Sequence, residues 1–418
     1  MKNNIKIVLL VITVLFIALQ SRATNNIYEN IESNSDQFDL RVNPQLEHDT
    51  CSHPLVKEYN YLNLNQNKIH YNNSDWTSFY YKLNHSSQNV VSIVHIGDSH
   101  LQADIATGKT RDLLQNQFGN AGRGIIAPLK LANTNQPMDY FFTCGGSYDA
   151  SSLMRRPWKS PIKLTGASFS PKKENFIVEV GMKNKSSQFK RIRIHLEGDL
   201  YIDSVSADNK VTLYDIDERS PNYTDIIFSE SVSSVKLLLS SIGRLTIHGV
   251  SLLNDCNGIM YNVIGNNGAS YYSYNNMGNL GVDCKILSPD LFIISLGANE
   301  AFGNLSNEAF YSTILTLITE LQLHNPNAAI LLATPMECQK NGRINHKIKQ
   351  FRDIIIQFGV DNNIAVYDWY EIAGGYNASN KWVKDRLMGK DRVHNTSKGY
   401  YIQGTILYEA LIKDLKNY

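Results

Sequence analysis

The pattern of apolar and polar positions predicts strands that alternate with helices at the two ends of the chain. Residues 90–96 form an apolar run that ends at the turn Gly97-Asp98-Ser99, and the amphipathic helix after it ends near Gly119. After residue 258 the alternation returns, with strands at 261–264, 291–296 and 329–333 and helices at about 308–324, 346–358 and 397–415. This order predicts a mostly parallel sheet that is covered on both faces.

The middle of the chain has a different pattern. From about residue 137 to 253, short apolar or alternating runs are separated by clusters of Gly, Asn, Ser, Asp and Pro. Such runs without helical spacing predict an inserted all-β sandwich. Residues 24 to about 70 are rich in Asn, Asp, Gln and Ser and are expected to form an extended lead-in, followed by a short helix that Ser74 and Asp75 cap.

The first 23 residues have the layout of an export signal. Lys2 and Lys6 precede an apolar run at residues 7–19, which is too short to span a bilayer comfortably, and Ser21 and Ala23 supply small residues at a cleavage site. We therefore expect export to the periplasm or beyond, with an uncleaved anchor as the alternative. No later stretch is apolar enough to cross a bilayer, so no stable membrane span is expected after cleavage.

Composition and charge narrow the possible partners. The 418 residues are 43% hydrophobic and 19% charged, which is typical of a globular protein with more than one folding unit. The 40 basic and 39 acidic side chains give no global argument for binding nucleic acid. The five cysteines show no zinc-binding spacing. Cys144 and Cys256 flank the insertion, and a disulfide between them is a hypothesis.

Chemistry-bearing residues follow the predicted strands. Ser99 comes directly after the first parallel strand, at the sheet edge where open α/β proteins bind ligands. A serine hydroxyl needs a base to become a nucleophile. Asp391 and His394 lie three residues apart just before the last helix, a spacing that lets a carboxylate orient an imidazole. Taken singly, each of these features is as well explained by turn chemistry or by a solvated surface residue.

Two further positions could stabilise an oxyanion. Gly268 follows the strand at 261–264, and its backbone N–H can approach a ligand closely because no Cβ intervenes. Asn299 follows the strand at 291–296 and carries a side-chain amide donor. Together with the N–H of Ser99 they would form an oxyanion hole. The combination with Asp391 and His394, each at a strand end or helix start, favours acyl transfer over unrelated turns.

These stretches resemble the sequence blocks of the SGNH/GDSL hydrolase family over about residues 88–128 and 258–418. In chain order, the matching stretches are Gly97-Asp98-Ser99, Gly268, Gly297-Ala298-Asn299-Glu300 and Asp391-Arg392-Val393-His394. The chain departs from the family pattern twice. His100 stands where GDSL has leucine, and Glu300 stands where the third block has aspartate, which leaves a supporting hydrogen bond open.

The resemblance implies a fold and a domain order. The fold would be a three-layer α/β/α hydrolase of flavodoxin-like arrangement, in two parts at residues 74–136 and 256–418. A jelly-roll-like β-sandwich at 137–255 would interrupt it, after a signal peptide at 1–23 and a lead-in at 24–73.

The resemblance also implies roles for the site residues. Ser99 would be the nucleophile, His394 the general base and Asp391 its orienting partner. Ser99 N–H, Gly268 N–H and the Asn299 side chain would be the oxyanion donors. No cofactor and no metal ion would be needed.

Within the family, the chain is similar to exported bacterial peptidoglycan O-acetylesterases with an inserted domain like a carbohydrate-binding module. The similarity rests on the stretches GDSHLQAD and FGNAGRG, on the position of the insertion and on the signal peptide. It implies a serine esterase that removes acetyl groups from a cell-wall glycan. An O-acetyltransferase with the same residues, or a glycan-binding protein on an inactive hydrolase scaffold, remains an alternative.

Other residues carry weaker expectations. His95 is expected to be a satisfied core histidine, and His100 to cap the helix after Ser99 rather than to contact substrate. Arg123, in a glycine-rich stretch taken as a loop, would hold a polar substrate group or lie on the surface. A basic cluster near the start of the insertion could attract an anionic glycan or be a solvated face. Its members are Arg155, Arg156, Lys159, Lys163, Lys172 and Lys173.

Overall fold

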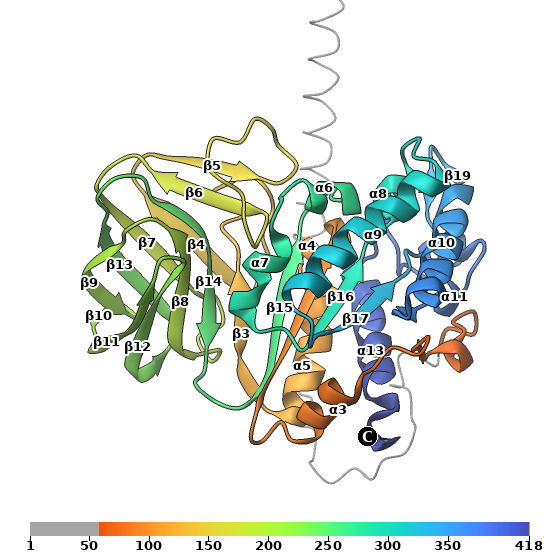
Figure 1. Cartoon of the computed structure of the whole chain (residues 1–418), viewed down its shortest axis with the longest axis horizontal. Coiled ribbons are helices and arrows are strands. Elements are labelled where there is room, and N and C mark those ends of the chain that lie inside the picture. Colours follow the sequence, from red (N-terminus) through yellow and green to blue (C-terminus); the bar gives the residue numbers. More distant parts are fainter. Residues whose placement is uncertain (1–57, 418) are drawn as a thin grey trace, which may run out of the picture. The chain divides into compact units, whose positions relative to one another are not determined.

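The fold is built on a mainly parallel central sheet, in a computed structural model that describes residues 58–417 (Figure 1). The predicted signal peptide lies outside these residues. In sheet order, the parallel strands are β20 (Ala365–Tyr367), β17 (Ala329–Ala333), β16 (Leu291–Ser295), β2 (Val90–Gly97), β15 (Gly258–Gly265) and β3 (Asn120–Ile126). Without β3, their order is 2-1-3-4-5 along the chain, which is the flavodoxin-like arrangement.

Helices cover both faces of this sheet. Successive side chains along a strand point to opposite faces, and apolar side chains of β2 lie on both. Val91 and Ile93 of β2 belong to one buried cluster, and Val94 and Ile96 to the other. The first face is covered by α3 (Thr77–Asn84), α5 (Ile105–Phe118) and α13 (Ser397–Lys413). The second is covered by α6 (Tyr271–Asn275), α7 (Leu280–Cys284), α9 (Asn307–His324) and α10 (His346–Asn362). The predicted three-layer α/β/α class is therefore confirmed.

Short helices complete this part of the chain. They are α4 (Ser99–Gln102), α8 (Ala298–Ala301), α11 (Trp369–Ile372), α12 (Ala378–Lys384) and the 3-10 turns η1 (Leu64–Gln66), η2 (Lys285–Leu287) and η3 (Leu415–Asn417). Within the predicted lead-in, β1 (Ile69–His70) pairs antiparallel with β20 at the sheet edge. A two-stranded hairpin joins β18 (Gln339–Lys340) to β19 (Arg343–Ile344).

The inserted segment forms an antiparallel β structure that encloses its own apolar core. One sheet contains β4 (Tyr140–Gly145), β7 (Asn175–Met182), β9 (Tyr201–Ala207), β10 (Lys210–Val211) and β13 (Ser234–Ser240). The facing strands are β5 (Tyr148–Ser152), β6 (Ala167–Pro171), β8 (Phe189–Glu197), β11 (Tyr214–Ser220), β12 (Tyr223–Val232) and β14 (Thr246–Leu253). We keep residues 137–255 as the proposed bounds of the insertion.

The insertion and the α/β part share one continuous sheet. Strand β14 pairs antiparallel with β3, which on its other edge pairs parallel with β15. This pairing holds the two ends of the insertion together, so no covalent clamp is needed. Cys144 lies on β4 opposite Val178, and both Cys144 and Cys256 are free thiols. The hypothesis of a disulfide between them is therefore wrong.

No helix within residues 58–417 is both long and apolar enough to cross a bilayer.

Candidate active site

The turn Gly97-Asp98-Ser99 places a hydroxyl at the carboxyl end of the central strand β2. A Cβ on Gly97 would lie 2.8 Å from the backbone oxygen of Ser295 and 2.7 Å from Leu101, so only glycine fits there. Asp98 caps α4 by accepting the N–H of His100 at 3.0 Å. Ser99 is therefore the first residue of a capped helical turn, where backbone N–H groups face incoming negative charge.

The structure joins Ser99, His394 and Asp391 in one hydrogen-bonded chain. The Ser99 Oγ lies 2.9 Å from His394 Nε2, and His394 Nδ1 lies 2.7 Å from Asp391 Oδ2. The other oxygen of Asp391 accepts the backbone N–H groups of Val393 and His394 at 3.0 and 3.1 Å. These bonds fix the carboxylate within its own loop. The carboxylate in turn favours the tautomer with the proton on Nδ1, which leaves Nε2 free to accept the serine proton.

The charges around His394 set its protonation. Burial lowers the pKa of His394, but the hydrogen bond and the charge of Asp391, together with the charge of Asp98, outweigh burial and raise that pKa above 6.5. For Asp391, burial raises the pKa, yet the bonds from His394 and the loop N–H groups hold it below its ordinary value. The pair is thus arranged to stabilise an imidazolium next to a carboxylate.

Replacing Asp391 with asparagine should move the acid limb of the kcat/KM profile to lower pH. The base must be neutral, so activity rises as His394 loses its proton, above pH 6.5 in the wild type. Without the carboxylate, burial opposes the imidazolium and only Asp98 still favours it. We also expect kcat to fall on the order of 10²- to 10⁴-fold, because the tautomer is no longer fixed. The measurement is the pH profile of 4-nitrophenyl acetate hydrolysis.

The control for this pH profile is His324→Gln, which replaces the last residue of α9, near the amino end of β17 and so away from the edge of the sheet that holds Ser99. Its limb should match that of the wild type. An unchanged limb in the Asp391→Asn protein would mean that another group controls the profile.

The turn that carries Gly268 is held against the end of β2. Gly268 has a φ of +79°, a backbone conformation that suits glycine. The backbone N–H of Asn266 donates to the Gly97 oxygen at 3.2 Å, and the Tyr274 hydroxyl donates to the same oxygen at 2.6 Å. These bonds bring the predicted second oxyanion donor to the sheet edge that holds Ser99.

Asn299 reaches the same turn from the start of α8. Its Nδ2 donates to the Ala269 backbone oxygen at 2.9 Å and to Asp98 Oδ2 at 3.3 Å. Both amide hydrogens of Asn299 therefore have acceptors. To bind an oxyanion, Asn299 would have to give up the longer of these two hydrogen bonds, the one to Asp98. The structure thus places Asn299 where the sequence predicts a donor, with its amide engaged.

Glu300, which stands where the family pattern has aspartate, holds the start of α6 close to the Gly268 turn. Its Oε1 accepts the backbone N–H of Tyr271, at the start of α6, at 2.7 Å. Burial raises the pKa of Glu300 to about 7. The supporting hydrogen bond left open by the sequence is present, and it holds the residues that follow Gly268.

Gln102 is a site residue that sequence reasoning missed. Its buried side chain accepts the backbone N–H of Asn267, next to Gly268, at 2.5 Å through Oε1. Its Nε2 donates to Thr134 Oγ1 at 2.8 Å and to the Asn135 backbone oxygen at 2.6 Å. Gln102 thus joins the Ser99 helix, the Gly268 turn and the segment that leads into the insertion. The stretch GDSHLQAD contained this residue, but its partners lie far away in sequence.

Replacing Gln102 with leucine should lower kcat about 10- to 100-fold, because the Asn267 N–H loses its acceptor and the Gly268 turn can shift. The comparison variant is Gln102→Glu, which keeps an oxygen for the Asn267 N–H but replaces the donors to residues 134 and 135 with a second carboxylate oxygen. Steady-state kinetics should show the leucine variant more impaired in kcat than the glutamate variant, at similar KM. Equal kcat for the leucine variant and the wild type would contradict this positioning role.

The structure settles the interpretations of two histidines, His95 and His100. His95 is buried, with its ring nitrogens 2.7 Å from the Tyr261 hydroxyl and 2.7 Å from Ser295 Oγ, so it is the core histidine expected. The expectation that His100 caps α4 is wrong, because Asp98 is the cap and the His100 ring lies 5.2 Å from the His394 ring. Burial lowers the pKa of His100.

Arg123 lies on neither a loop nor the surface. It belongs to β3, and its side chain is 7% exposed and pairs with Asp104 and Asp139. The expected position in a loop and the expected surface role are therefore wrong. The guanidinium is enclosed by carboxylates that approach it from α5 and from the start of the insertion.

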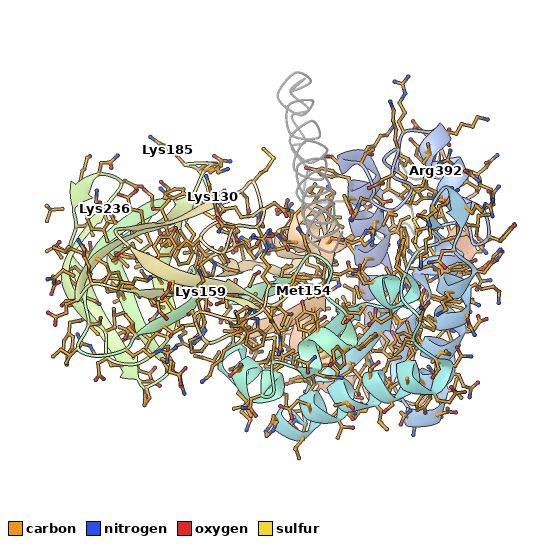
Figure 2. All side chains as sticks on the ribbon, turned by 90° about the horizontal axis from the view of Figure 1, so that it is seen from above. Lys130, Met154, Lys159, Lys185, Lys236 and Arg392 are labelled. Carbon is orange, nitrogen blue, oxygen red and sulfur yellow. The ribbon has the colours of Figure 1, made fainter. Side chains whose placement is uncertain are left out.

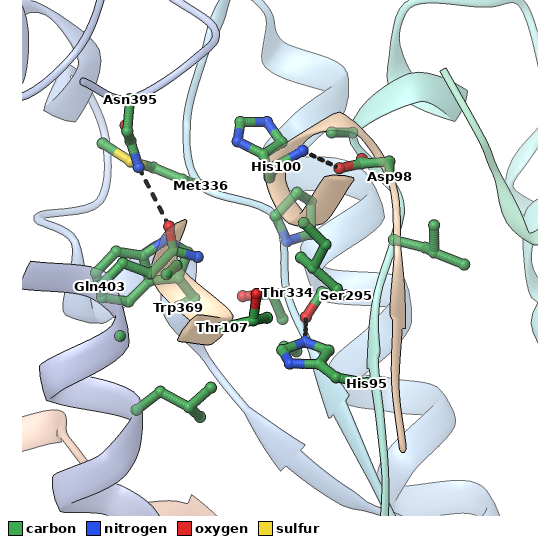
Figure 3. A pocket seen from close by; sticks show the side chains of 18 of the residues that line it. His95, Asp98, His100, Thr107, Ser295, Thr334, Met336, Trp369, Asn395 and Gln403 are labelled. Atoms are coloured by element: carbon green, nitrogen blue, oxygen red, sulfur yellow. Dashed lines mark hydrogen bonds between the residues drawn. The ribbon is translucent and has the colours of Figure 1, made fainter. Parts of the chain in front are cut away.

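A cavity of about 60 Å³ is lined by residues that flank Ser99 and His394 in the sequence, several of which are drawn in Figure 3. Its lining includes Asp98 and His100 on one side and Asn395 and Gln403 on the other, and neither Ser99 nor His394 contributes to it. Its size suits a few water molecules rather than a sugar. The glycan that carries the ester would therefore lie outside this cavity.

Known proteins are similar to this chain in sequence and in fold. Residues 252–402 match the model of the GDSL-like lipase/acylhydrolase family. The fold is similar to that of a peptidoglycan O-acetylesterase, with a TM-score of 0.71 and 18% identity, over 84% of this chain and 99% of that one. The predicted resemblance to this family is thereby confirmed.

Other similar structures cover only part of the chain. A lipase/acylhydrolase from Enterococcus faecalis has a TM-score of 0.31 and 20% identity over 38% of this chain and 78% of its own. An acetylxylan esterase from Geobacillus stearothermophilus has a TM-score of 0.29 and 19% identity over 38% and 73%. No curated protein matches the sequence.

Proposed function

We propose that this chain, which carries a domain of the GDSL-like lipase/acylhydrolase family at residues 252–402, removes acetyl groups from a cell-wall glycan by way of an acyl-Ser99 intermediate. The observation that carries the proposal is the hydrogen-bonded chain from Ser99 through His394 to Asp391. A nucleophile, a base and an orienting carboxylate within hydrogen-bonding distance of one another are the parts that acyl transfer requires.

Acylation would begin with attack of Ser99 Oγ on the acetyl carbonyl carbon. His394 Nε2 takes the serine proton, and Asp391 stabilises the imidazolium that forms. The carbonyl oxygen becomes an oxyanion, which the N–H groups of Ser99 and Gly268 and the amide of Asn299 would bind. Collapse of this intermediate breaks the bond to the sugar oxygen. That oxygen leaves as a hydroxyl because His394 returns the proton.

Deacylation would reverse these roles with water as the nucleophile. His394 takes a proton from the water as it attacks the acetyl-Ser99 ester, and the same donors hold the second oxyanion. The acyl bond to Ser99 breaks, His394 returns its proton to Ser99 Oγ, and acetate leaves. Every step uses side chains and backbone N–H groups of this chain together with water, and no cofactor.

The choice of a glycan substrate rests on two features. The similar solved structure that spans most of the chain is named a peptidoglycan O-acetylesterase, and it shares the fold of the insertion as well as that of the α/β part. The export signal expected in residues 1–23 would bring the protein to the cell wall. Both features support a cell-wall ester as the substrate.

The test is release of acetate from O-acetylated peptidoglycan and from acetylated xylan, with the Ser99→Ala protein as the blank. We expect the protein without residues 1–23 to release acetate from peptidoglycan faster than from xylan. Release no faster than the blank from both polymers would overturn the proposal. Transfer of acetyl to an added acceptor glycan, in excess of free acetate, would point instead to an O-acetyltransferase.

A further inference from the structure

The loop between β5 and β6 leaves the insertion and packs into the core of the α/β part. Leu153, Ile162 and Leu164 are buried in the same cluster as the side chains of α6, α7 and α9. The backbone N–H of Leu164 donates to Asp283 at 3.1 Å, and that of Leu153 donates to the Gly166 oxygen at 2.7 Å, which closes the base of the loop. The loop is therefore fixed to the enzyme domain by apolar burial and by hydrogen bonds.

This loop lies directly on the turn that holds the proposed oxyanion donor. Asn266 Nδ2 donates to the Thr165 oxygen at 3.1 Å, and a Cβ on Gly166 would lie 2.4 Å from that amide nitrogen. At the other end of the loop, Met154 Cε lies 3.8 Å from where a Cβ on Gly268 would be. Met154 is 44% exposed. Any ester held by the Gly268 N–H would therefore have Met154 as a neighbour.

The residues that follow Met154 are cationic and exposed. In the part of the chain that the structure describes, Arg155, Arg156 and Lys159 make no ion pair, whereas Lys163 and Lys172 of the same basic cluster pair with acidic side chains. Figure 2 shows Lys159 on the insertion side of Met154. Among the described residues, the predicted basic cluster thus divides into paired members, Lys163 and Lys172, and unpaired members, of which Arg155, Arg156 and Lys159 closely follow Met154 along the chain.

Contacts with the rest of the protein hold the Arg156 side chain and the Lys159 backbone in place. The Arg156 guanidinium lies 4.2 Å from the centre of the Trp158 ring, and Trp158 packs against the buried cluster of the α/β part. The backbone N–H of Lys159 donates to Ser151 Oγ at 2.8 Å. A guanidinium held in place by an aromatic ring loses less conformational entropy when it binds a carboxylate, and its planar fork matches the two carboxylate oxygens.

We propose that Arg155, Arg156 and Lys159 bind a carboxylate group of the glycan beside the ester, and so select anionic over neutral acetylated glycans. This inference rests on the proposed function and adds the charge of the substrate to it. The insertion would then act as one wall of the active site, not as a separate binding module. Its contribution lies in the loop at residues 153–166, which orders the cations next to Gly268.

The test uses one glycan in two charge states. O-acetylated peptidoglycan is compared before and after its carboxyl groups are converted to neutral amides, with 4-nitrophenyl acetate as a small neutral ester. For the wild type, we expect a KM about tenfold lower for the carboxylate form, and a smaller difference at high salt, because exposed charges act weakly and are screened. The double variant Arg155→Gln/Arg156→Gln should lose most of this difference in KM, because only Lys159 of the three cations remains, and it should still hydrolyse 4-nitrophenyl acetate.

The matched control is Lys183→Gln/Lys185→Gln, which removes two exposed cations from another loop of the insertion. In Figure 2, Lys185 lies farther from Met154 than Lys159 does. The control should retain the preference of the wild type. Equal KM values for the arginine variant and the wild type on the carboxylate form would overturn the inference alone. No acetate from either glycan with the wild type, despite 4-nitrophenyl acetate hydrolysis, would overturn the proposed function as well.

Discussion

Replacing Ser99 with alanine is expected to lower kcat for ester hydrolysis by roughly 10⁴- to 10⁶-fold and to leave the fold unchanged. The variant cannot form an acyl-enzyme, so hydrolysis depends on direct attack by water near the remaining oxyanion donors. The Ser99 hydroxyl bonds His394 at 2.9 Å at a partly exposed position, so its loss creates little buried unpaired surface. Burst kinetics with 4-nitrophenyl acetate and thermal unfolding measure the two effects separately.

The chain offers a matched control in Ser295. Its hydroxyl lies 2.7 Å from His95 Nε2, which is the same kind of serine–histidine contact at the end of the neighbouring strand, but with a buried histidine. Ser295→Ala should keep kcat within about tenfold of the wild type and lose about 1–3 kcal/mol of stability, because it leaves a buried imidazole nitrogen unpaired. The opposite outcome, loss of kcat in the Ser295 variant and normal turnover without Ser99, would refute the choice of nucleophile.

The parallel sheet and its edge residues could be predicted from the sequence because they depend on local signals. The apolar runs that became β2, β16 and β17 are buried on both faces, and such runs have few other places in a globular fold. Once the strands are parallel, their carboxyl ends meet at one edge. The convergence of Ser99, Gly268 and Asn299 then follows from topology rather than from any property of the loops.

Strand β3 could not be predicted, because its sequence NAGRGII looks like a loop. The glycines are there for another reason. A Cβ on Gly122 would lie 2.4 Å from the Leu252 oxygen, and one on Gly124 would lie 2.8 Å from the Tyr261 oxygen. The neighbouring backbones of β14 and β15 approach β3 too closely for side chains. Such contacts between distant segments leave no periodic pattern in the sequence, which is also why Arg123 was misplaced.

The role of the loop at residues 153–166 was hidden for a similar reason. Its apolar residues are buried in the core of the α/β part, whereas the apolar residues of the strands around it form the core of the insertion. From sequence, both groups look like one β domain. Gln102 was missed because hydrogen-bonding side chains carry no periodicity, and its partners at Thr134 and Asn267 lie on separate segments.

Replacing Asp104 with asparagine is expected to lower the free energy of unfolding by about 3 kcal/mol, the largest stability effect that we expect for a single charge in this chain. Asp104 is buried and accepts from Arg111 at 2.9 Å and also pairs with Arg123. Asparagine keeps the shape and tolerates the left-handed backbone at this position, where φ is +56°. The substitution therefore leaves two buried guanidinium groups to share Asp139, whose side chain is 34% exposed.

Urea unfolding, followed by circular dichroism, measures the free energy of unfolding. The control is Glu179→Gln, which breaks an exposed cross-strand ion pair with Lys236 and should lower that free energy by less than about 1 kcal/mol. If Asp104 acts through the guanidinium groups, adding Arg123→Met to Asp104→Asn should cost less than the sum of the two single changes, because the second change removes a cation that the first had left unpaired. Strict additivity, or a loss no larger than that of the exposed pair, would mean that burial and not pairing sets the stability of this cluster.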